Sequence, residues 1–207
     1  MTGYDISWPQ CGFSFPPASP IAVVGATNGQ AFTTNPCFGQ EAAWAGPGAS
    51  FYVNLNAPGG PDPHRFDSGP AGMCAPNDVR CASYNFGYHT VQAAIGFARS
   101  TGHSAPMWWL DVEAQNTWTS DAIANDDVIA GAIQAVHEAG AQAAVYSTAR
   151  QWSEIASADY RPGVPVWYPT GQVTSAPNSW CAASSFTGGP VYMVQVVAGP
   201  FDGDYTC

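Results

Sequence analysis

Short runs of β-branched and aromatic residues recur along the whole chain, and segments with helical periodicity separate them. Such runs, bounded by Gly, Pro, Asn and Ser, are typical of strands buried in a sheet. The pattern predicts strands over residues 4–7, 21–26, 50–55, 107–112, 143–147, 164–168 and 191–197.

The clearest helix is predicted over residues 120–139. Ser120 or Asp121 can cap its start, and Gly140 follows its end as a stop signal. Its apolar positions recur at helical spacing, at Ile129, Ala132, Ile133 and Val136. Further helices are expected over 88–100, 36–45 and 149–156.

Strands that alternate with helices favour a parallel sheet whose strands are joined by crossover helices. The chain has 207 residues, which fits one domain, whereas a regular (β/α)₈ barrel usually takes about 250 residues. We therefore expect an α/β fold over residues 1–207: a single-domain, irregular TIM-like β/α barrel with eight strands, fewer than eight helices and disulfide bonds. The stretch 57–81, rich in Pro, Gly and Asp, is expected to be a long loop.

Six cysteines are present, and none of them forms the C-x-x-C spacing of a redox motif or a zinc site. Their even number favours three disulfides in an oxidising compartment, and sequence alone allows fifteen pairings. Proximity along the chain suggests three pairs: Cys11 with Cys37, Cys74 with Cys81, and Cys181 with Cys207. We therefore expect a secreted protein. The chain start has neither a basic nor an apolar signal region, which implies that any signal peptide has been removed.

Charge excludes several function classes. The chain has fifteen acidic residues, five Arg and no Lys, for a formal net charge of −10. So few cations cannot neutralise a nucleic-acid backbone, and without Lys there is no Walker-type phosphate loop. No run is long and apolar enough to span a membrane. We expect no cofactor, no metal site and a monomer; the four His residues lack H-x-x-x-H spacing.

Acidic residues follow the predicted strands, where the carboxyl ends of a parallel barrel open onto a common mouth. Asp5 lies late in the first strand, Asp111 and Glu113 close the strand 107–112, and Asp202 follows the last predicted strand. Other polar residues at strand ends are Asn28, Asn54, Tyr146, Tyr168 and Gln195.

Asp111 and Glu113 are two positions apart, so on a strand both point to one face, with Trp109 one layer below. A D-x-E pair can occur by chance on a solvated edge. Here, however, it ends a tryptophan-rich, otherwise apolar strand in a chain with only 10% charged residues. Two carboxyls in such a pocket cannot both ionise freely, which raises one pKa and suits a general acid in glycoside hydrolysis.

The ordered motifs resemble those of the family 25 glycoside hydrolases, the Chalaropsis-type lysozymes. The matching segments are GYDIS at 3–7, GATNG at 25–29, LDVE at 110–113, VYS at 145–147, VW at 166–167, Gln195 and DG at 202–203. This resemblance spans nearly the whole chain. It implies an irregular eight-stranded barrel that cleaves the β-1,4 bond from N-acetylmuramic acid to N-acetylglucosamine in peptidoglycan.

By this resemblance Glu113 is the general acid/base. Asp111 either steers the substrate's N-acetyl group in a substrate-assisted reaction or attacks the sugar. Asp5 and Asp202 are two further acids of the cleft. Residues expected to contact the substrate, peptidoglycan or a related amino-sugar glycan, are Tyr146, Gln195, Asn28, Asn54, Tyr52, Tyr168 and Trp167.

The chain departs from the family pattern at four positions. Asn28 replaces a common Glu, Val53 a His, and Val194 and Val196 the aromatic residues beside Gln195. We expect these changes to weaken stacking on sugars. The alternative function is therefore a barrel that keeps the acidic cleft but binds cell-wall glycan, or a partner protein, without cutting it. A family 18 chitinase is excluded because Trp109 and Pro106 stand where its D-x-x-D-x-D-x-E motif requires Asp.

Overall fold

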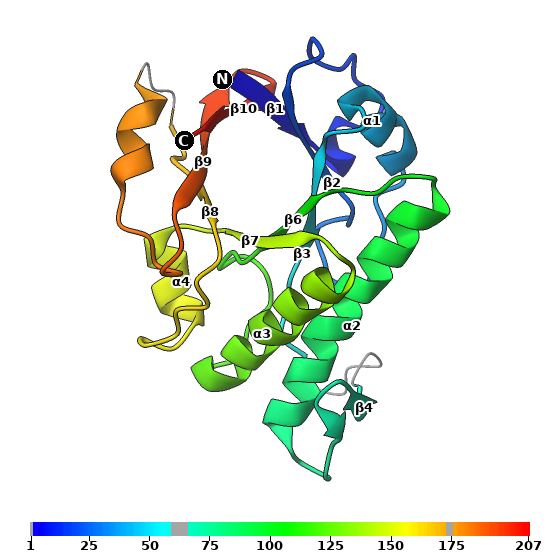
Figure 1. The fold of residues 1–207 in the computed structure, drawn as a ribbon, viewed down its shortest axis with the longest axis vertical. Coiled ribbons are helices and arrows are strands. Elements are labelled where there is room, and N and C mark those ends of the chain that lie inside the picture. Colours follow the sequence, from blue (N-terminus) through cyan, green and yellow to red (C-terminus); the bar gives the residue numbers. More distant parts are fainter. Residues whose placement is uncertain (1, 59–65, 173–175) are drawn as a thin grey trace.

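The computed structural model describes residues 2–58, 66–172 and 176–207 and forms the predicted closed barrel (Figure 1). Around the barrel the strand order is β1-β10-β9-β8-β7-β6-β3-β2. All neighbouring strands are parallel except β10, which runs antiparallel to both β1 and β9. The strand bounds are β1 Thr2–Ile6, β2 Ile21–Gly25, β3 Ser50–Asn54, β6 Met107–Asp111, β7 Gln142–Tyr146, β8 Val166–Pro169, β9 Val191–Ala198 and β10 Phe201–Thr206.

Seven of these strands confirm the predicted segments to within about two residues at each end. The eighth, β10, was not located in the sequence. Its residues, FDGDYT, include two aspartates and a glycine, which are depleted in strands. They form a strand because β10 lies between β1 and β9, which complete its backbone hydrogen bonds on both sides.

Four α-helices occur among the described residues: α1 Phe38–Ala45, α2 Val79–Ser100, α3 Ala122–Glu138 and α4 Ala149–Ile155. Two 3₁₀ turns, η1 Trp8–Gln10 and η2 Pro177–Ala182, follow β1 and β8. Fewer than eight helices therefore cover the barrel, as predicted. Helices α2 and α3 lie side by side against one wall (green in Figure 1).

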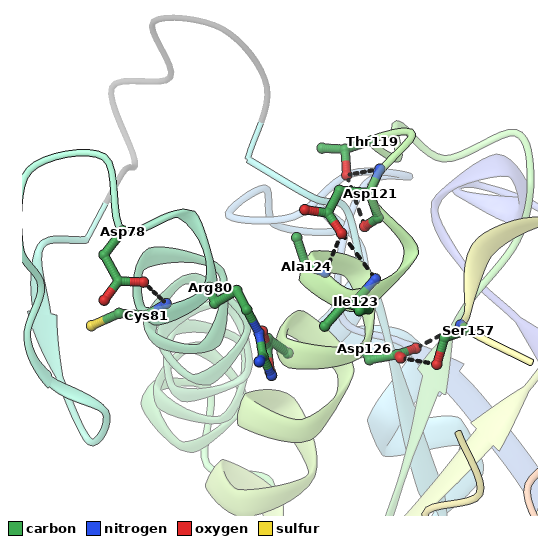
Figure 2. Close-up of polar contacts among 10 residues, drawn as sticks. Asp78, Arg80, Cys81, Thr119, Asp121, Ile123, Ala124, Asp126 and Ser157 are labelled. Atoms are coloured by element: carbon green, nitrogen blue, oxygen red, sulfur yellow. Dashed lines mark hydrogen bonds and ion pairs between the residues drawn. The ribbon is translucent and has the colours of Figure 1, made fainter. Parts of the chain in front are cut away.

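Helix α2 starts nine residues before the predicted residue 88, so it takes in the last three residues of the loop predicted over 57–81. It begins at Val79, because the Asp78 side chain accepts the backbone N–H of Cys81 and caps it (Figure 2). Its first turns bury the polar side chains of Ser83 and Asn85, so apolar residues do not recur there at the helical spacing by which a helix is predicted. Before it, β4 Ser68–Gly69 and β5 Gly72–Met73 form a small hairpin. The predicted loop also includes 59–65, which lie outside the described residues.

Helix α3 begins as predicted, with Asp121 as its cap. The Asp121 carboxylate accepts the backbone N–H groups of Ile123 and Ala124 at 3.1 and 3.2 Å (Figure 2). Gly140, just beyond its end, has a φ of +80°, the left-handed conformation of a helix stop. Further along, Asp126 accepts the backbone N–H of Ser157 at 3.0 Å, which ties α3 to the segment after α4.

The core has two layers on either side of the barrel wall. Inside the barrel, apolar side chains fill the centre below the mouth: Val23, Met107, Trp109, Ala144, Trp167 and Met193. Outside, residues such as Leu110 and Val112 pack against the helices. This alternation confirms that Trp109 and Leu110 face opposite sides of β6, so the strand delivers every second side chain to the barrel interior.

Three disulfides join Cys11 to Cys37, Cys74 to Cys81 and Cys181 to Cys207, so the pairing suggested by sequence proximity is confirmed. The first holds the segment after β1 to the start of α1, and the third holds η2 to the C-terminal residue. Among the described helices, none combines the length and the apolar character that crossing a bilayer requires.

Candidate active site

A cavity of about 210 Å³ opens at the mouth of the barrel, where the parallel strands have their carboxyl ends. It is smaller than the roughly 300–1,000 Å³ of most ligand pockets. The lining residues are Asp5, Ser7, Pro9, Gln10, Tyr52, Asp111, Glu113, Tyr146, Trp167, Gln195 and Asp202. The four acids singled out in the sequence thus meet in one hollow.

The strand register brings these residues together. Asp111 is the last residue of β6, and its neighbours across the sheet are Asn54 on β3 and Tyr146 on β7. Asp5 on β1 lies opposite Asp202 on β10. Because β10 runs antiparallel, Asp202 near its start lies at the same end as the carboxyl ends of the other strands.

Asp111 is nearly buried, at 5% exposure, and side-chain amides surround it. Asn54 donates to one carboxyl oxygen, and Asn116 donates to the other at 3.5 Å. Asn54 is itself held by the Thr27 hydroxyl, which donates to its side-chain oxygen at 2.7 Å. Asn54 therefore contacts Asp111 rather than lining the cavity.

Glu113 lies at the more exposed edge of the site, just beyond β6. Its carboxylate accepts the Gln115 amide at 3.1 Å, and Gln151 also hydrogen-bonds to it. Its own carbonyl accepts the indole N–H of Trp118 at 2.9 Å, which fixes the backbone after the strand.

Burial raises the pKa of both Asp111 and Glu113. The charge of Glu113 raises the pKa of Asp111 further, and a hydrogen bond joins the two carboxyls. Two ionised carboxylates within hydrogen-bonding reach would repel each other, so the pair keeps one proton to a higher pH than separate carboxyls would.

A second group of polar residues occupies the opposite side of the mouth. The Tyr146 hydroxyl donates to the Gln195 side-chain oxygen at 2.8 Å, and the Gln195 amide donates to Asp5 at 2.9 Å. Burial raises the pKa of Asp5 to about 7, and the nearby charge of Asp202 raises it too, while the Gln195 hydrogen bond lowers it. Burial also raises the pKa of Asp202.

Tyr52 and Tyr146 lie between the two acidic groups. Burial, followed by the charges of carboxylates from both groups, raises the pKa of each phenol well above its ordinary value. Both phenols are therefore neutral at physiological pH and can donate hydrogen bonds. Trp167, packed against Tyr146 with ring centroids 4.5 Å apart, forms the floor.

Besides Asn54, two further predicted substrate contacts do not line this cavity. Asn28 is exposed in the loop after β2. Tyr168 follows Trp167 on β8, so its side chain points out of the barrel, where it packs against Trp180 with ring centroids 5.6 Å apart.

The expectation that valines at family aromatic positions weaken sugar stacking is corrected by the same alternation. Val194 and Val196 are buried outside the barrel beneath η2, on either side of the inward-facing Gln195. Val53 is likewise buried among the helices. These three side chains do not reach the cavity, so their identity does not change its walls.

Sequence reasoning missed Asp204, a fully buried carboxyl behind Asp202. The spacing Asp202-Gly203-Asp204 was the available signal, because alternate residues of a strand share a face. It was not used because β10 itself was not predicted.

Among the described residues, one cluster has metal-ligand spacing: Cys11, Cys37 and Glu41. The two cysteines form a disulfide and so offer no thiolate to a metal.

The fold is that of an irregular, closed TIM-like β/α barrel with four acids at its mouth. The sequence profile of the lysozyme-like protein 1 family matches residues 78–186, which is more than half of the chain. No curated protein matches the chain. The chain belongs to the lysozyme-like protein 1 family.

Solved structures with the same fold include the wild-type modular Cpl-1 endolysin complexed with a peptidoglycan analogue, at 14% identity and a TM-score of 0.59. Another is the multimodular pneumococcal cell-wall endolysin from phage Cp-1 complexed with choline, at 13% identity and a TM-score of 0.58. Both similarities cover 100% of this chain and 54% of the endolysin chain. The barrel implied by the family 25 resemblance is thus confirmed at the level of the fold.

Proposed function

We propose that this protein is a secreted muramidase-like glycosidase that hydrolyses β-1,4 bonds of peptidoglycan or a related amino-sugar glycan. The observation that carries the proposal is the hydrogen-bonded pair of Asp111 and Glu113, placed in a cavity that also contains Asp5 and Asp202. The endolysin complexed with a peptidoglycan analogue supports the substrate class, and the three disulfides support an extracellular site of action.

Glu113 is the general acid/base of the proposed reaction, because it is the more accessible member of the pair. The one proton of the pair passes from Asp111 to Glu113, and Glu113 gives it to the oxygen of the glycosidic bond as that bond breaks. Glu113 then accepts a proton from the water that attacks the anomeric carbon, which restores the resting state.

Asp111 is the orienting carboxyl. Asn54 and Asn116 engage both of its oxygens, which favours a role in steering the substrate's N-acetyl group over direct attack on the sugar. In this substrate-assisted scheme the N-acetyl oxygen attacks the anomeric carbon while the bond to the leaving oxygen breaks. The attack of water on that carbon then breaks its new bond to the N-acetyl oxygen. The direct contact between the two carboxyls leaves no space for the water that an inverting pair would hold between them.

The test is release of reducing ends from purified peptidoglycan. The Glu113→Gln variant should lower turnover by about 10²- to 10⁴-fold, because the amide cannot transfer a proton. Glu154→Gln is the matched control. This residue lies on the surface of α4, where it pairs with Arg150, and its replacement should leave turnover unchanged.

Muropeptide analysis identifies the bond that is cut: a muramidase leaves N-acetylmuramic acid at the new reducing end. Equal rates for the wild type and the Glu113→Gln variant would remove Glu113 from its assigned role. Binding without product from any wall preparation would instead support the non-catalytic barrel.

A further inference from the structure

Asp204 on β10 has no part in the reaction described above, yet it is the most deeply buried carboxyl of the barrel mouth. It follows Asp202 by two residues, so both face the interior, with Asp204 one layer deeper and fully buried. One of its oxygens accepts the Trp167 indole N–H at 2.9 Å. The other oxygen, Oδ2, is buried and accepts no N–H or hydroxyl hydrogen from the described residues.

An ionised carboxylate in this position would be strongly unfavourable, because one oxygen would lack both water and a donor. A protonated carboxyl would not, because its O–H needs an acceptor rather than a donor. Asp5, on the adjacent strand β1, provides that acceptor: a side-chain hydrogen bond links Asp5 and Asp204. Two carboxyls can share a hydrogen bond only if one of them carries a proton.

The surroundings decide which carboxyl carries the proton. Asp5 lines the cavity, where water reaches it, and it accepts the Gln195 amide at 2.9 Å. Asp204 has one neutral donor and no access to solvent. The negative charge is therefore more stable on Asp5 than on Asp204.

We propose that Asp204 is a positioning residue that stays protonated and whose O–H donates a hydrogen bond to Asp5. Asp5 then faces the cavity as a carboxylate held between Asp204 and Gln195. The groups packed around Asp204 agree with this assignment. Trp167 on β8 and Gln195 on β9 are neutral, and the charged neighbours are Asp5 on β1 and Asp202 on its own strand. Burial, followed by the charge of Asp5, raises the pKa of Asp204 well above its ordinary value.

The catalytic consequence rests on the function proposed above. A fixed Asp5 carboxylate lies across the mouth from Glu113, where it lines the same cavity as the reacting sugar. Loss of the Asp204 proton donor would free the Asp5 side chain to rotate, and it would raise the pKa of Asp5 above about 7, because the Asp204 hydrogen bond lowers that pKa.

Two substitutions of similar volume separate the protonated from the ionised state. In Asp204→Asn the amide oxygen can accept from Trp167 and the amide N–H can donate to Asp5, so kcat/KM should stay within about threefold of the wild type. In Asp204→Leu both contacts are lost, so kcat/KM should fall by about ten- to a hundredfold. If Asp204 were ionised and functional, the Asn variant would instead lose activity as severely as the Leu variant.

The pH profile provides a readout that a purely structural role would not move. The acid limb of kcat/KM should shift to higher pH in Asp204→Leu and stay in place in Asp204→Asn. Equal acid limbs in a folded Leu variant would overturn the proposal. If the Leu variant does not fold, the Asn variant and the titration below decide.

Carbon-13 NMR titration of the aspartate carboxyls tests the proton assignment without any substrate, so it remains decisive if the wild type does not cut peptidoglycan. Asp204, assigned by comparison with Asp204→Asn, should show the chemical shift of a neutral acid and no titration between about pH 5 and 8. Asp5 should titrate near pH 7. An Asp204 carboxyl that is already ionised at pH 5 would refute the inference.

Discussion

Two glycines of helix α2 can be compared as sites of substitution, because one lies at the contact with α3 and the other does not. Gly87 lies in α2 where it crosses α3, and a Cβ atom built on it would stand 1.9 Å from the carbonyl oxygen of Val128. A Cβ atom built on Gly131 of α3 would likewise stand 2.0 Å from the carbonyl oxygen of Tyr84. Gly96, nine residues further along α2, is exposed and meets no atom of another element within 4 Å of its Cβ position.

The expected effects have opposite signs. An added methyl at Gly87 meets helix backbone, which cannot rotate away as a side chain can, so the two helices must separate. Overpacking of this kind costs about 1–3 kcal/mol, and we expect the upper end, whereas the better helix propensity of Ala recovers only about 1 kcal/mol. At Gly96 only the propensity gain remains. We therefore expect Gly87→Ala to lower the free energy of unfolding by about 2 kcal/mol and Gly96→Ala to raise it by up to about 1 kcal/mol.

Thermal and urea unfolding of the two variants beside the wild type measure this difference. For a chain of this size about 1 kcal/mol shifts Tm by about 2–4 °C, so Gly87→Ala should unfold about 4–8 °C lower and Gly96→Ala up to about 4 °C higher. A Gly87→Ala variant as stable as the wild type would show that the helices do not touch at this crossing (Figure 1).

Three further predictions follow from the polar contacts. Burial raises the pKa of Asp5 from 3.8 to about 7, so the folded state binds a proton that the unfolded state has released. The contribution of Asp5 to stability should therefore fall as pH rises from about 4 to 7, by at most about 4 kcal/mol because Asp5 is partly open to the cavity, and the raised pKa values of the other buried acids of the mouth act in the same direction. Urea unfolding across this range checks it, and stability that rises with pH would contradict it. Asp121→Ala removes the cap of α3 (Figure 2) and should cost about 1 kcal/mol, measured as a Tm lowered by about 2–4 °C; an unchanged Tm would refute the role of the cap. Asn54→Leu removes an amide donor from Asp111 and should lower kcat on peptidoglycan by about tenfold with little change in KM, whereas a change in KM alone would assign Asn54 to substrate binding.

Much of the fold was predictable because it depends on local patterns. Seven strands were located from short apolar runs, and α3 from its cap, its period and its glycine stop. The disulfide pairing followed from short sequence separations. The acidic cluster was also predictable in outline, since the carboxyl ends of parallel strands share one mouth whatever the details of the barrel.

Other features depend on contacts between distant segments, which local patterns do not contain. The strand β10 exists because β1 and β9 hydrogen-bond to it, although its own residues disfavour a strand. The outward direction of Tyr168, Val194 and Val196 follows from the alternation of side chains once Trp167 and Gln195 face inward.

The sequence by itself determined where most strands of the barrel and helix α3 lie, because β-branched and aromatic runs, caps and glycine stops act within a few residues. Only the tertiary structure decided which carboxyls share a proton. Burial raises the pKa of all four carboxyls, the charge of Glu113 raises the pKa of Asp111 further, and the charge of Asp5 raises the pKa of Asp204 further. Both effects depend on distances across the barrel, and for Asp5 and Asp204 those distances arise only when the first and last strands close it.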